Sequence, residues 1–381
     1  MQFLSEDHEA LRAAVREFAE SEIRPRAMAI DREGKIPPEI LRKMGELGYL
    51  GIPYPEEWGG AGMDTLSYAI AVEEVSRACA STGITMAAHT SLGIYPIYKY
   101  GTLAQKEHYL KKLTSGDWIG AFGLTEPGAG SDAGGTTTTA VRDGDGWVLN
   151  GSKIYITNGK MARALITAAR TSKEAGTRGI SAFVIEQPNP GISVGKLEDK
   201  LGCRGSETAE LHFQDVRVPA DALLGEVNRG FPIFLDTLDG GRVSIGAMAL
   251  GIARAAFEAS VEYARTRQQF GQPIAEFQGL QWILADMATQ IETARLHVYN
   301  AARLKDSGVR FKKESAMAKL VASEVAMWVT TKAIQVHGGI GYMRELPVER
   351  YFRDAKLLEI GEGTSEIQRT VIAREVLKNG A

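Results

Sequence analysis

The spacing of apolar residues in the first third of the chain predicts helices. Leu11, Val15 and Phe18 follow one another at intervals of four and three residues, which is the period of an amphipathic helix. Ser5 stands before them and is followed by an acidic first turn, so it is a candidate N-cap. Helical patterns recur up to the end of the segment 1–117, and we expect that segment to form a helical domain.

The pattern changes to short strands over residues 118–230. Thr and Val runs flank the sequence DGDG at 143–146, a combination that predicts a tight hairpin. Further strands are expected at 164–170, 180–186 and 209–218. Because no helical segments separate these strands, we expect an antiparallel β-domain and not a βαβ array.

Helical spacing returns in the last third, residues 231–381. The segment 313–334 has one apolar face, formed by Met317, Val321, Val325 and Trp328. Three glycines within 337–342 should end this helix, and a final helix is expected from Thr364 to Leu377. The order helical, β, helical predicts an α+β protein of several domains.

Composition and charge place the chain among ordinary globular proteins. It has 381 residues, of which 44% are hydrophobic and 24% charged, and this excludes wholesale disorder and a disulfide-stabilised miniprotein. The 44 basic and 47 acidic side chains give a formal net charge of −3. This charge argues against a protein made chiefly to bind nucleic acid.

Cysteine and histidine usage predicts neither a disulfide framework nor a metal site. Cys79 and Cys203 lie far apart, and none of the six histidines has metal-ligand spacing. Together with an N-terminus that lacks a leader pattern, this usage predicts a cytoplasmic protein. The longest mostly apolar stretch, Val243–Ala253, has 11 residues. A membrane helix needs about 20, so we expect no membrane span.

Two short motifs point to functions that their surroundings do not support. Residues 128–133 match GxGxxA, but two more glycines and a Thr run follow, where a dinucleotide-binding fold needs a helix. Residues 191–195 match GxSxG, but prolines precede them and a charged segment follows, where a nucleophile elbow needs a strand and then a helix. We therefore reject a Rossmann fold and keep a serine hydrolase only as a weak alternative.

Five other segments occur together and in order. They are AFGLTEPGAGSDA (121–133), KIYITNG (153–159), ARTRQQFGQPI (264–274), QVHGGIGY (335–342) and EGTSEIQR (362–369). In these segments the chain resembles the acyl-CoA dehydrogenases, and the resemblance covers essentially its whole length. It implies an N-terminal helical domain, a middle antiparallel β-barrel and a C-terminal four-helix bundle. It also implies a homotetramer, built as a dimer of dimers, with electron-transferring flavoprotein as electron acceptor.

The implied reaction is α,β-dehydrogenation of an acyl-CoA to the trans-2-enoyl-CoA. Such a reaction needs a base for the α-proton and an acceptor for the β-hydride. No side chain accepts a hydride, so the protein must use a flavin or nicotinamide, and the resemblance implies FAD with transfer to flavin N5. The resemblance assigns the base to Glu362, whose pKa burial against an apolar ligand would raise. Some family members carry the base on an earlier helix, at the position of Gly241, where this chain has no carboxylate.

The resemblance also implies contacts to FAD from several segments. The loop residues that would line the flavin ring are Phe122, Leu124, Thr125, Gly130 and Ser131. The strand residues beside the ring would be Tyr155, Ile156 and Thr157. Contacts across a subunit interface are implied for Arg267, Phe270, Gln278, Gln335, Val336, Gly338 and Gly339. The adenine side would be formed by Thr364, Ser365 and Glu366.

The acyl-CoA itself is implied to contact Ser131, Asp239, Arg242 and Gly363. An ordinary helix arginine is a competing interpretation of Arg242. The acyl pocket should be lined by 80–100. Its part 79–94 contains no Lys or Arg, which argues against a glutaryl-CoA substrate. The sequence is closest to short-chain, short-branched-chain or medium-chain members. A flavin-dependent acyl-CoA oxidase that uses O₂ and a non-catalytic acyl-CoA or flavin-binding scaffold stay as alternatives, although Glu362 argues against the scaffold.

Overall fold

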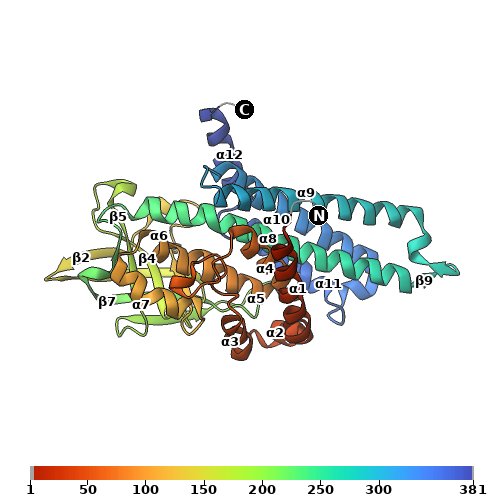
Figure 1. Ribbon diagram of the computed structural model, residues 1–381, viewed down its shortest axis with the longest axis horizontal. Coiled ribbons are helices and arrows are strands. Elements are labelled where there is room, and N and C mark those ends of the chain that lie inside the picture. The colour runs from red at the N-terminus through yellow and green to blue at the C-terminus, as the bar shows by residue number, and fades with distance from the viewer. Residues whose placement is uncertain (1–3, 380–381) are drawn as a thin grey trace.

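A computed structural model of the chain describes residues 4–379. Figure 1 shows a β-region at one end, long helices extending to the other end, and the N-terminal helices packed along one side. The N-terminal helices are α1 (Glu6–Phe18), α2 (Ala27–Glu33), α3 (Pro38–Glu46), α4 (Thr65–Ala78), α5 (Ala80–Ala87), α6 (Tyr95–Tyr100) and α7 (Leu103–Thr114). The N-cap prediction is confirmed, because the Ser5 side chain accepts a hydrogen bond from the His8 backbone N–H.

The β-region is one eight-stranded sheet. Its strands are β1 (Gly120–Gly123), β2 (Thr139–Asp143), β3 (Gly146–Thr157), β4 (Ala164–Arg170), β5 (Ile180–Glu186), β6 (Ile192–Leu197), β7 (Thr208–Pro219) and β8 (Leu223–Leu224). They run in the order β6-β7-β3-β2-β4-β5-β8, and β1 pairs with β4. The predicted hairpin is confirmed, since Asp143 pairs with Gly146 across a two-residue turn.

The predicted β-barrel is wrong, because the sheet does not close. One terminal strand, β8, is only two residues long, and the other, β6, is exposed along most of its length. These two edge strands, β6 and β8, do not pair with each other, so the sheet stays open. The prediction of antiparallel pairing also fails at β4, which pairs in parallel with β1 and at one position with β2. β1 enters from the helical region before the hairpin, so its direction along β4 is not set by a tight turn.

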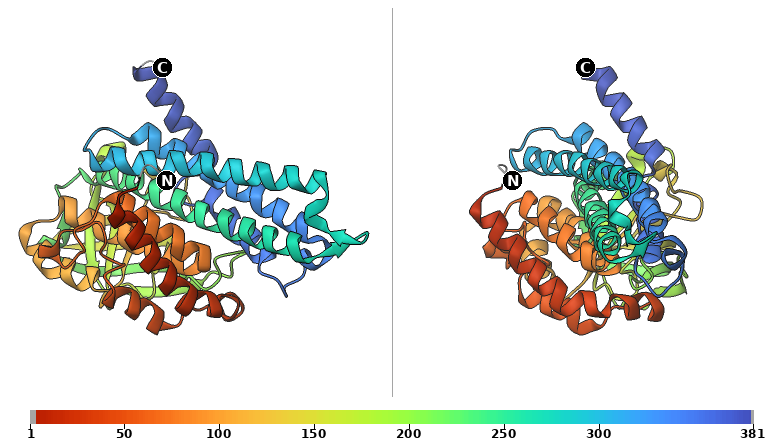
Figure 2. Two further views of the ribbon diagram at one scale, coloured as in Figure 1. Left: turned by 45° about the vertical axis from the view of Figure 1, so that its right-hand side comes forward. Right: turned by 90° about the vertical axis from the view of Figure 1, so that its right-hand side faces the viewer.

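The C-terminal region is built from long helices. They are α8 (Gly230–Thr266), α9 (Gln278–Asp306), α10 (Lys312–His337), α11 (Val348–Lys356) and α12 (Ser365–Asn379), and a small hairpin of β9 (Gln268–Gln269) and β10 (Gln272–Pro273) joins α8 to α9. α8 packs against α4, α9 and α10 and shares one apolar core with them. α12 stands away from the body in the views of Figure 2.

Helix α8 departs from the expectation that no segment is long and apolar enough to cross a membrane. By length and composition α8 passes that test, because Gly and Ala extend its apolar character beyond the short run seen in the sequence. However, 78% of the apolar window is buried inside the protein. This burial is what the core helix of a helical bundle requires.

Neither of the two short glycine motifs, GxGxxA and GxSxG, has the local structure that its function would need. Residues 128–133 lead into a single 3₁₀ turn at Ala133–Gly135, where a dinucleotide-binding fold would need an α-helix. Ser193 lies within strand β6, where a nucleophile elbow would need a sharp turn. Among residues 4–379 no group of His, Cys, Asp or Glu could hold a metal ion.

Helix α4 carries two adjacent glutamates into the interior. Glu73 is 1% exposed and Glu74 is fully buried. The Arg254 guanidinium on α8 lies 2.7 Å from a carboxylate oxygen of each. Further partners are Arg16, Arg77 and Arg295, together with the Tyr299 hydroxyl, which donates to Glu73. We call this set the α4 charge cluster, and it joins α1, α4, α8 and α9.

Candidate active site

Glu362 lies in the short loop between α11 and α12, and the loop backbone is unusual. Glu362 has φ +54° and Gly363 has φ +96°, so two consecutive residues adopt left-handed conformations. Residues with a Cβ rarely adopt the φ of Gly363, which explains the glycine at this position. The Gln368 amide donates to the carbonyls of Glu362 (3.3 Å) and Gly363 (2.9 Å). Lys319 on α10 donates to the Gly363 carbonyl at 2.7 Å. The loop is therefore held from two helices.

Glu362 is half-buried as a whole, and one oxygen of its carboxylate lacks a hydrogen-bond partner. Its Oε2 atom is buried and has no hydrogen-bond partner among the described residues. Burial raises the pKa of Glu362 to about 7, and the charges of Lys319 and Arg242 oppose this rise. A carboxylate with a pKa near neutrality and a free lone pair is suited to take a proton from a bound ligand.

Helix α8 presents Gly241 to the same point in space. A Cβ at Gly241 would lie 2.2 Å from Glu362 Oε2 and 3.1 Å from the Leu92 Cδ2 atom. The position where some family members carry the base therefore faces the Glu362 carboxylate directly. Arg242, the next residue, is 4% exposed and pairs with Asp239 at 2.5 Å. Its Nε atom is buried and has no hydrogen-bond partner among the described residues, which distinguishes it from a solvated helix arginine.

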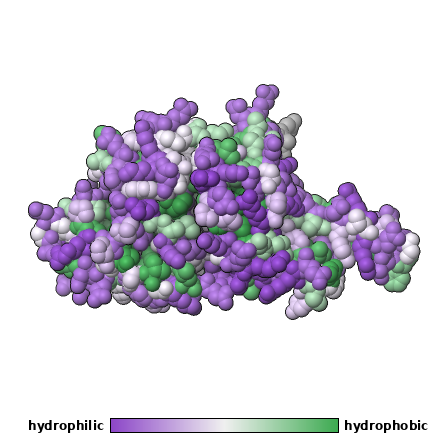
Figure 3. Space-filling view, turned by 90° about the horizontal axis from the view of Figure 1, so that it is seen from below, coloured by the Kyte–Doolittle hydropathy of each residue, from purple (hydrophilic) through white to green (hydrophobic). Residues whose placement is uncertain are grey.

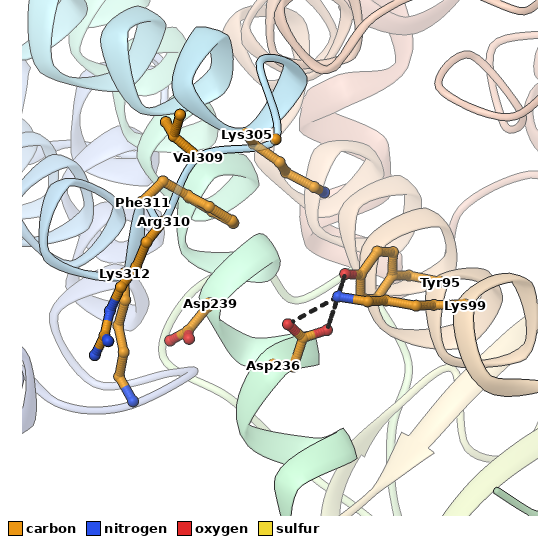
Figure 4. Close-up of a pocket in the computed structure, with 10 residues that line it drawn as sticks. Tyr95, Lys99, Asp236, Asp239, Lys305, Val309, Arg310, Phe311 and Lys312 are labelled. Carbon is orange, nitrogen blue, oxygen red and sulfur yellow. Dashed lines mark hydrogen bonds and ion pairs between the residues drawn. The ribbon is translucent and has the colours of Figure 1, made fainter.

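A cavity of about 570 Å³ lies beside Asp239 (Figure 4). Its charged lining comes from α6, α8, α9, the segment before α10 and the first residue of α10, and consists of Lys99, Asp236, Asp239, Lys305, Arg310 and Lys312. Lys99 pairs with Asp236 at 2.9 Å, and burial lowers the pKa of Lys305 to about 8. Sequence reasoning found only Asp239 of this set. The cations lie far apart in sequence and share no motif, so no local signal could have grouped them.

The two segments that the family resemblance implies to contact the flavin, the loop 121–133 and strand β3, lie side by side. The Ile154 N–H donates to the Thr125 carbonyl at 2.9 Å, which fixes the loop 121–133 against β3. Lys153, fully buried, pairs with Glu126 at 2.7 Å and donates to the Leu124 carbonyl at 3.2 Å. Sequence reasoning missed this ion pair, although both residues lie in motifs that it used. A buried lysine inside a strand is itself the signal that could have found it.

The individual residues of these two segments differ in exposure. Phe122 packs its ring against Phe234, with centroids 5.1 Å apart, and Leu124 is buried. Thr125 and Thr157 are half-buried, whereas Gly130, Ser131 and Tyr155 are exposed. Ile156 is 2% exposed and belongs to the sheet core, so only its backbone is free to meet a cofactor. Tyr155 has φ +57°, at a register shift between β3 and β7.

The residues implied to act across an interface lie elsewhere. Arg267 and Phe270 belong to the β9–β10 hairpin, at the end of the molecule opposite the β-sheet in Figure 1. This end projects from the body in Figure 3. Stacking of Tyr263 on His337 (4.4 Å) holds the hairpin end of α8 beside the α10 terminus. The exposed members of this group are Arg267, Phe270, Gln278, Gln335, Gly338 and Gly339, whereas Val336 is buried. One chain therefore does not bring these residues to Glu362.

The N-terminal end of α12 forms a second, smaller cavity, of about 290 Å³. It is lined by Thr364, Ser365 and Glu366 together with Lys356 and Arg369. The Ser365 hydroxyl is buried and has no hydrogen-bond partner among the described residues. The lining also includes Glu359 and Glu324, which pair with Lys356 at 2.6 Å and with Arg369 at 2.5 Å. Both cations are therefore already paired, and the Ser365 hydroxyl at the helix N-terminus is the feature that fits the phosphate-bearing part of FAD.

The geometry can be compared with known proteins. The chain matches the acyl-CoA dehydrogenase N-terminal domain over residues 5–117, the middle domain over 121–216 and the C-terminal domain over 228–377. It is 51% identical over 376 residues to the mitochondrial short-chain specific acyl-CoA dehydrogenase of Bos taurus, covering 99% of this chain and 91% of that protein.

Two solved structures have nearly the same fold as this chain. Butyryl-CoA dehydrogenase from Megasphaera elsdenii is 46% identical, with a TM-score of 0.97, over 98% of this chain and 99% of that one. A chain solved in work on the electron transferring flavoprotein of Acidaminococcus fermentans is 49% identical, with a TM-score of 0.98, over the whole of both chains. The chain therefore belongs to the acyl-CoA dehydrogenases, a family of flavoprotein oxidoreductases.

Proposed function

We propose that the protein is an FAD-dependent acyl-CoA dehydrogenase that acts on short, medium or branched acyl-CoA thioesters. The observation that carries this proposal is the Glu362 carboxylate: its Oε2 atom is buried and lacks a hydrogen-bond partner among the described residues, and its pKa is raised to about 7. A short acyl chain is favoured by the names of the relatives. It is also favoured by Leu92, which lies beside the base.

In this proposal Glu362 removes the α-proton of the bound thioester. The carboxylate is about half ionised at neutral pH and mostly ionised above it, and its free Oε2 atom can accept the proton without breaking another bond. Bound FAD would supply the acceptor for the hydride that leaves the β-carbon. Arg242 and Lys319 keep positive charge near the carboxylate, which favours a site that holds negative charge as the proton moves.

The cavity in Figure 4 is the proposed site for the phosphates of CoA. Its four cations exceed its two carboxylates. Arg310 also pairs with Glu375 at 2.5 Å, whereas Lys312 forms no salt bridge with a described residue. A nucleotide with several phosphate charges would complement this lining. Asp239 and Arg242 on α8 lie between the cavity and the Glu362 loop, so a thioester arm running from the cavity would reach the base.

Removing two of these cations gives a first test. We expect the double variant Arg310→Ala, Lys312→Ala to raise KM for butyryl-CoA about tenfold, because each lost charged contact weakens phosphate binding. The turnover number should change little, since neither residue lies beside Glu362. Exposed Lys35→Ala is the matched control. With butyryl-pantetheine, which lacks the nucleotide, the double variant should equal the unaltered protein. An equal KM increase with this truncated thioester would contradict the assignment.

The FAD site is proposed to be shared between copies of the chain. The flavin-side segments lie in the β-region, whereas Arg267 and Phe270 lie at the far end of the chain's long helices. Phe270 is 93% exposed on the hairpin, as expected for a side chain that inserts into a neighbouring subunit. We propose a homotetramer on this basis. A monomeric mass in solution with FAD tightly bound would overturn it.

Electron-transferring flavoprotein is proposed as the electron acceptor. Support comes from the family and from the similarity to a chain solved in work on that protein in Acidaminococcus fermentans. An oxidase differs in its second half-reaction, where O₂ takes the electrons. Admitting air to reduced enzyme separates the two: fast reoxidation with hydrogen peroxide release would favour the oxidase, and slow reoxidation that electron-transferring flavoprotein accelerates would favour the dehydrogenase.

The decisive test of the proposed function is anaerobic. The purified yellow protein is mixed with acyl-CoA thioesters of increasing length and with isobutyryl-, 2-methylbutyryl-, isovaleryl- and glutaryl-CoA, and the visible spectrum is recorded. We expect short thioesters to bleach the flavin absorbance and glutaryl-CoA to leave it unchanged. A flavin that no thioester bleaches would instead support the non-catalytic scaffold.

A further inference from the structure

We propose that Lys319 is a positioning residue for the base: its ammonium group anchors the loop that carries Glu362 and sets a positive charge beside the carboxylate. This inference rests on the proposed role of Glu362. Lys319 does not itself touch the reacting atoms. It acts through the backbone and through the electric field at the carboxylate.

The anchor is a direct hydrogen bond in the protein interior. Lys319 is fully buried on α10, and its Nζ donates to the Gly363 carbonyl at 2.7 Å. That carbonyl belongs to the second of two consecutive left-handed residues. Such a backbone persists only where its surroundings hold it. Lys319 and Gln368 supply two donors to this one carbonyl, so the carboxylate is presented from a fixed loop.

A neutral donor would be enough to anchor a carbonyl, and this is why the charge on Lys319 is informative. Burying a lysine without a salt-bridge partner is costly, and Lys319 forms no salt bridge with a carboxylate of the described residues; its hydrogen bond is to the Gly363 carbonyl. Burial lowers the pKa of Lys319 to about 8, so the ammonium group persists at neutral pH. The charge faces Glu362, whose pKa it lowers.

The other charged and titratable groups around the pair come from four elements. Arg242 on α8 also lowers the pKa of Glu362, and it opposes the protonation of Lys319. Glu359, before the loop, and Glu366 on α12 favour the charged form of Lys319. Tyr68 on α4 interacts with Glu362 and stays neutral because burial raises its pKa well above the usual range. Lys319 is thus the cation that both anchors the loop and opposes the rise in the pKa of Glu362 that desolvation causes.

The test measures the ionisation of Glu362 directly. pH-difference infrared spectra of the FAD-loaded protein give the pKa of Glu362, as the carboxyl band that is missing in the Glu362→Gln variant. In Lys319→Met we expect this pKa to rise by about one unit, because a nearby positive charge has been removed. The rate of flavin reduction by butyryl-CoA at pH 7 should fall about fivefold, because the ionised fraction of Glu362 falls, and recover toward the unaltered rate at about pH 9, with KM little changed.

Three further variants separate charge from structure. Lys319→Arg keeps a charge and a donor and should keep the Glu362 pKa. Lys319→Gln keeps a donor without the charge, and it should shift the pKa even if Lys319→Met does not fold. Lys200→Met removes a lysine that also donates to a backbone carbonyl, that of Ser206, but in the β-region, and should leave the pKa unchanged. An unshifted Glu362 pKa in folded Lys319→Met or Lys319→Gln would overturn the inference. If instead Glu362→Gln still reduces its flavin at the normal rate, the proposed function fails, whatever the pKa shows.

Discussion

Replacing Glu362 by Gln is expected to lower the rate of flavin reduction by an acyl-CoA roughly a thousandfold. The amide has nearly the shape of the carboxylate, so it should fit the same loop. It cannot take the α-proton, because its nitrogen carries two hydrogens and its oxygen is a weak base. FAD content and thioester affinity should be preserved, because Glu362 Oε2 makes no hydrogen bond that the substitution would break. Rapid-mixing measurement of flavin bleaching gives the rate.

The pH dependence provides a second readout of the same residue. Because the base must be ionised, kcat/KM of the unaltered enzyme should rise with pH through about 7, the pKa to which burial raises Glu362. The residual activity of the Gln variant should lack this limb. Glu57→Gln, an exposed carboxylate on the surface loop after α3, is the matched control and should behave as the unaltered enzyme. Normal flavin reduction in Glu362→Gln would remove Glu362 from the mechanism.

The second large effect is expected on stability, from Arg254→Met in the α4 charge cluster. Arg254 contacts both buried glutamates at 2.7 Å. Its loss leaves them underpaired, and removing one partner of a buried ion pair costs about 3–5 kcal/mol. Arg16, Arg295 and Tyr299 remain as partners, so the lower part of that range is expected. Thermal unfolding of the FAD-loaded protein should show a midpoint lower by several degrees.

Acid should reduce the difference between this variant and the unaltered protein. The cluster lowers the pKa of Glu74 to about 2, from a model-peptide value of 4.5. A carboxyl whose pKa is lower in the folded state than in the unfolded state stabilises the fold fully when the pH is above the unfolded-state pKa. That contribution is lost as the pH falls toward the folded-state pKa. The difference in midpoint should therefore be full at neutral pH and shrink below about pH 4.5. Arg42→Met, which removes an exposed arginine on α3, should leave the midpoint unchanged at every pH. A variant as stable as the unaltered protein would show that the cluster is dispensable.

Much of the architecture could be predicted from the sequence because local chemistry determines it. The Ser5 cap, the hairpin at 143–146 and the last helix each depend on residues a few positions apart. The closure of the sheet was predicted wrongly, because it depends on whether β6 and β8, which no local pattern links, can meet. The parallel pairing of β1 with β4 is likewise a long-range choice.

Some residues of the candidate site could likewise be located from the sequence, and others could not. Glu362 lies in a motif that could be located by resemblance, and so do the segments around Thr125 and Tyr155. Lys319 and the cavity cations could not be located, because their importance lies in which carbonyl or cavity they meet after folding. Lys319 is one lysine on a long helix, and its sequence neighbours give no sign that it points to Gly363.

The contact between Gly241 and Glu362 also limits how such a site can evolve. A carboxylate gained first at position 241 would compete with Glu362 for one volume, since even a Cβ there lies 2.2 Å from Glu362 Oε2. A carboxylate lost first at position 362 would leave no base at all. If Glu362 is the base, as proposed, each single step is expected to lower activity and only the pair to restore it, which is reciprocal sign epistasis. The location of the base should therefore be inherited as a fixed character, while substrate preference drifts around it through residues that make no such collision.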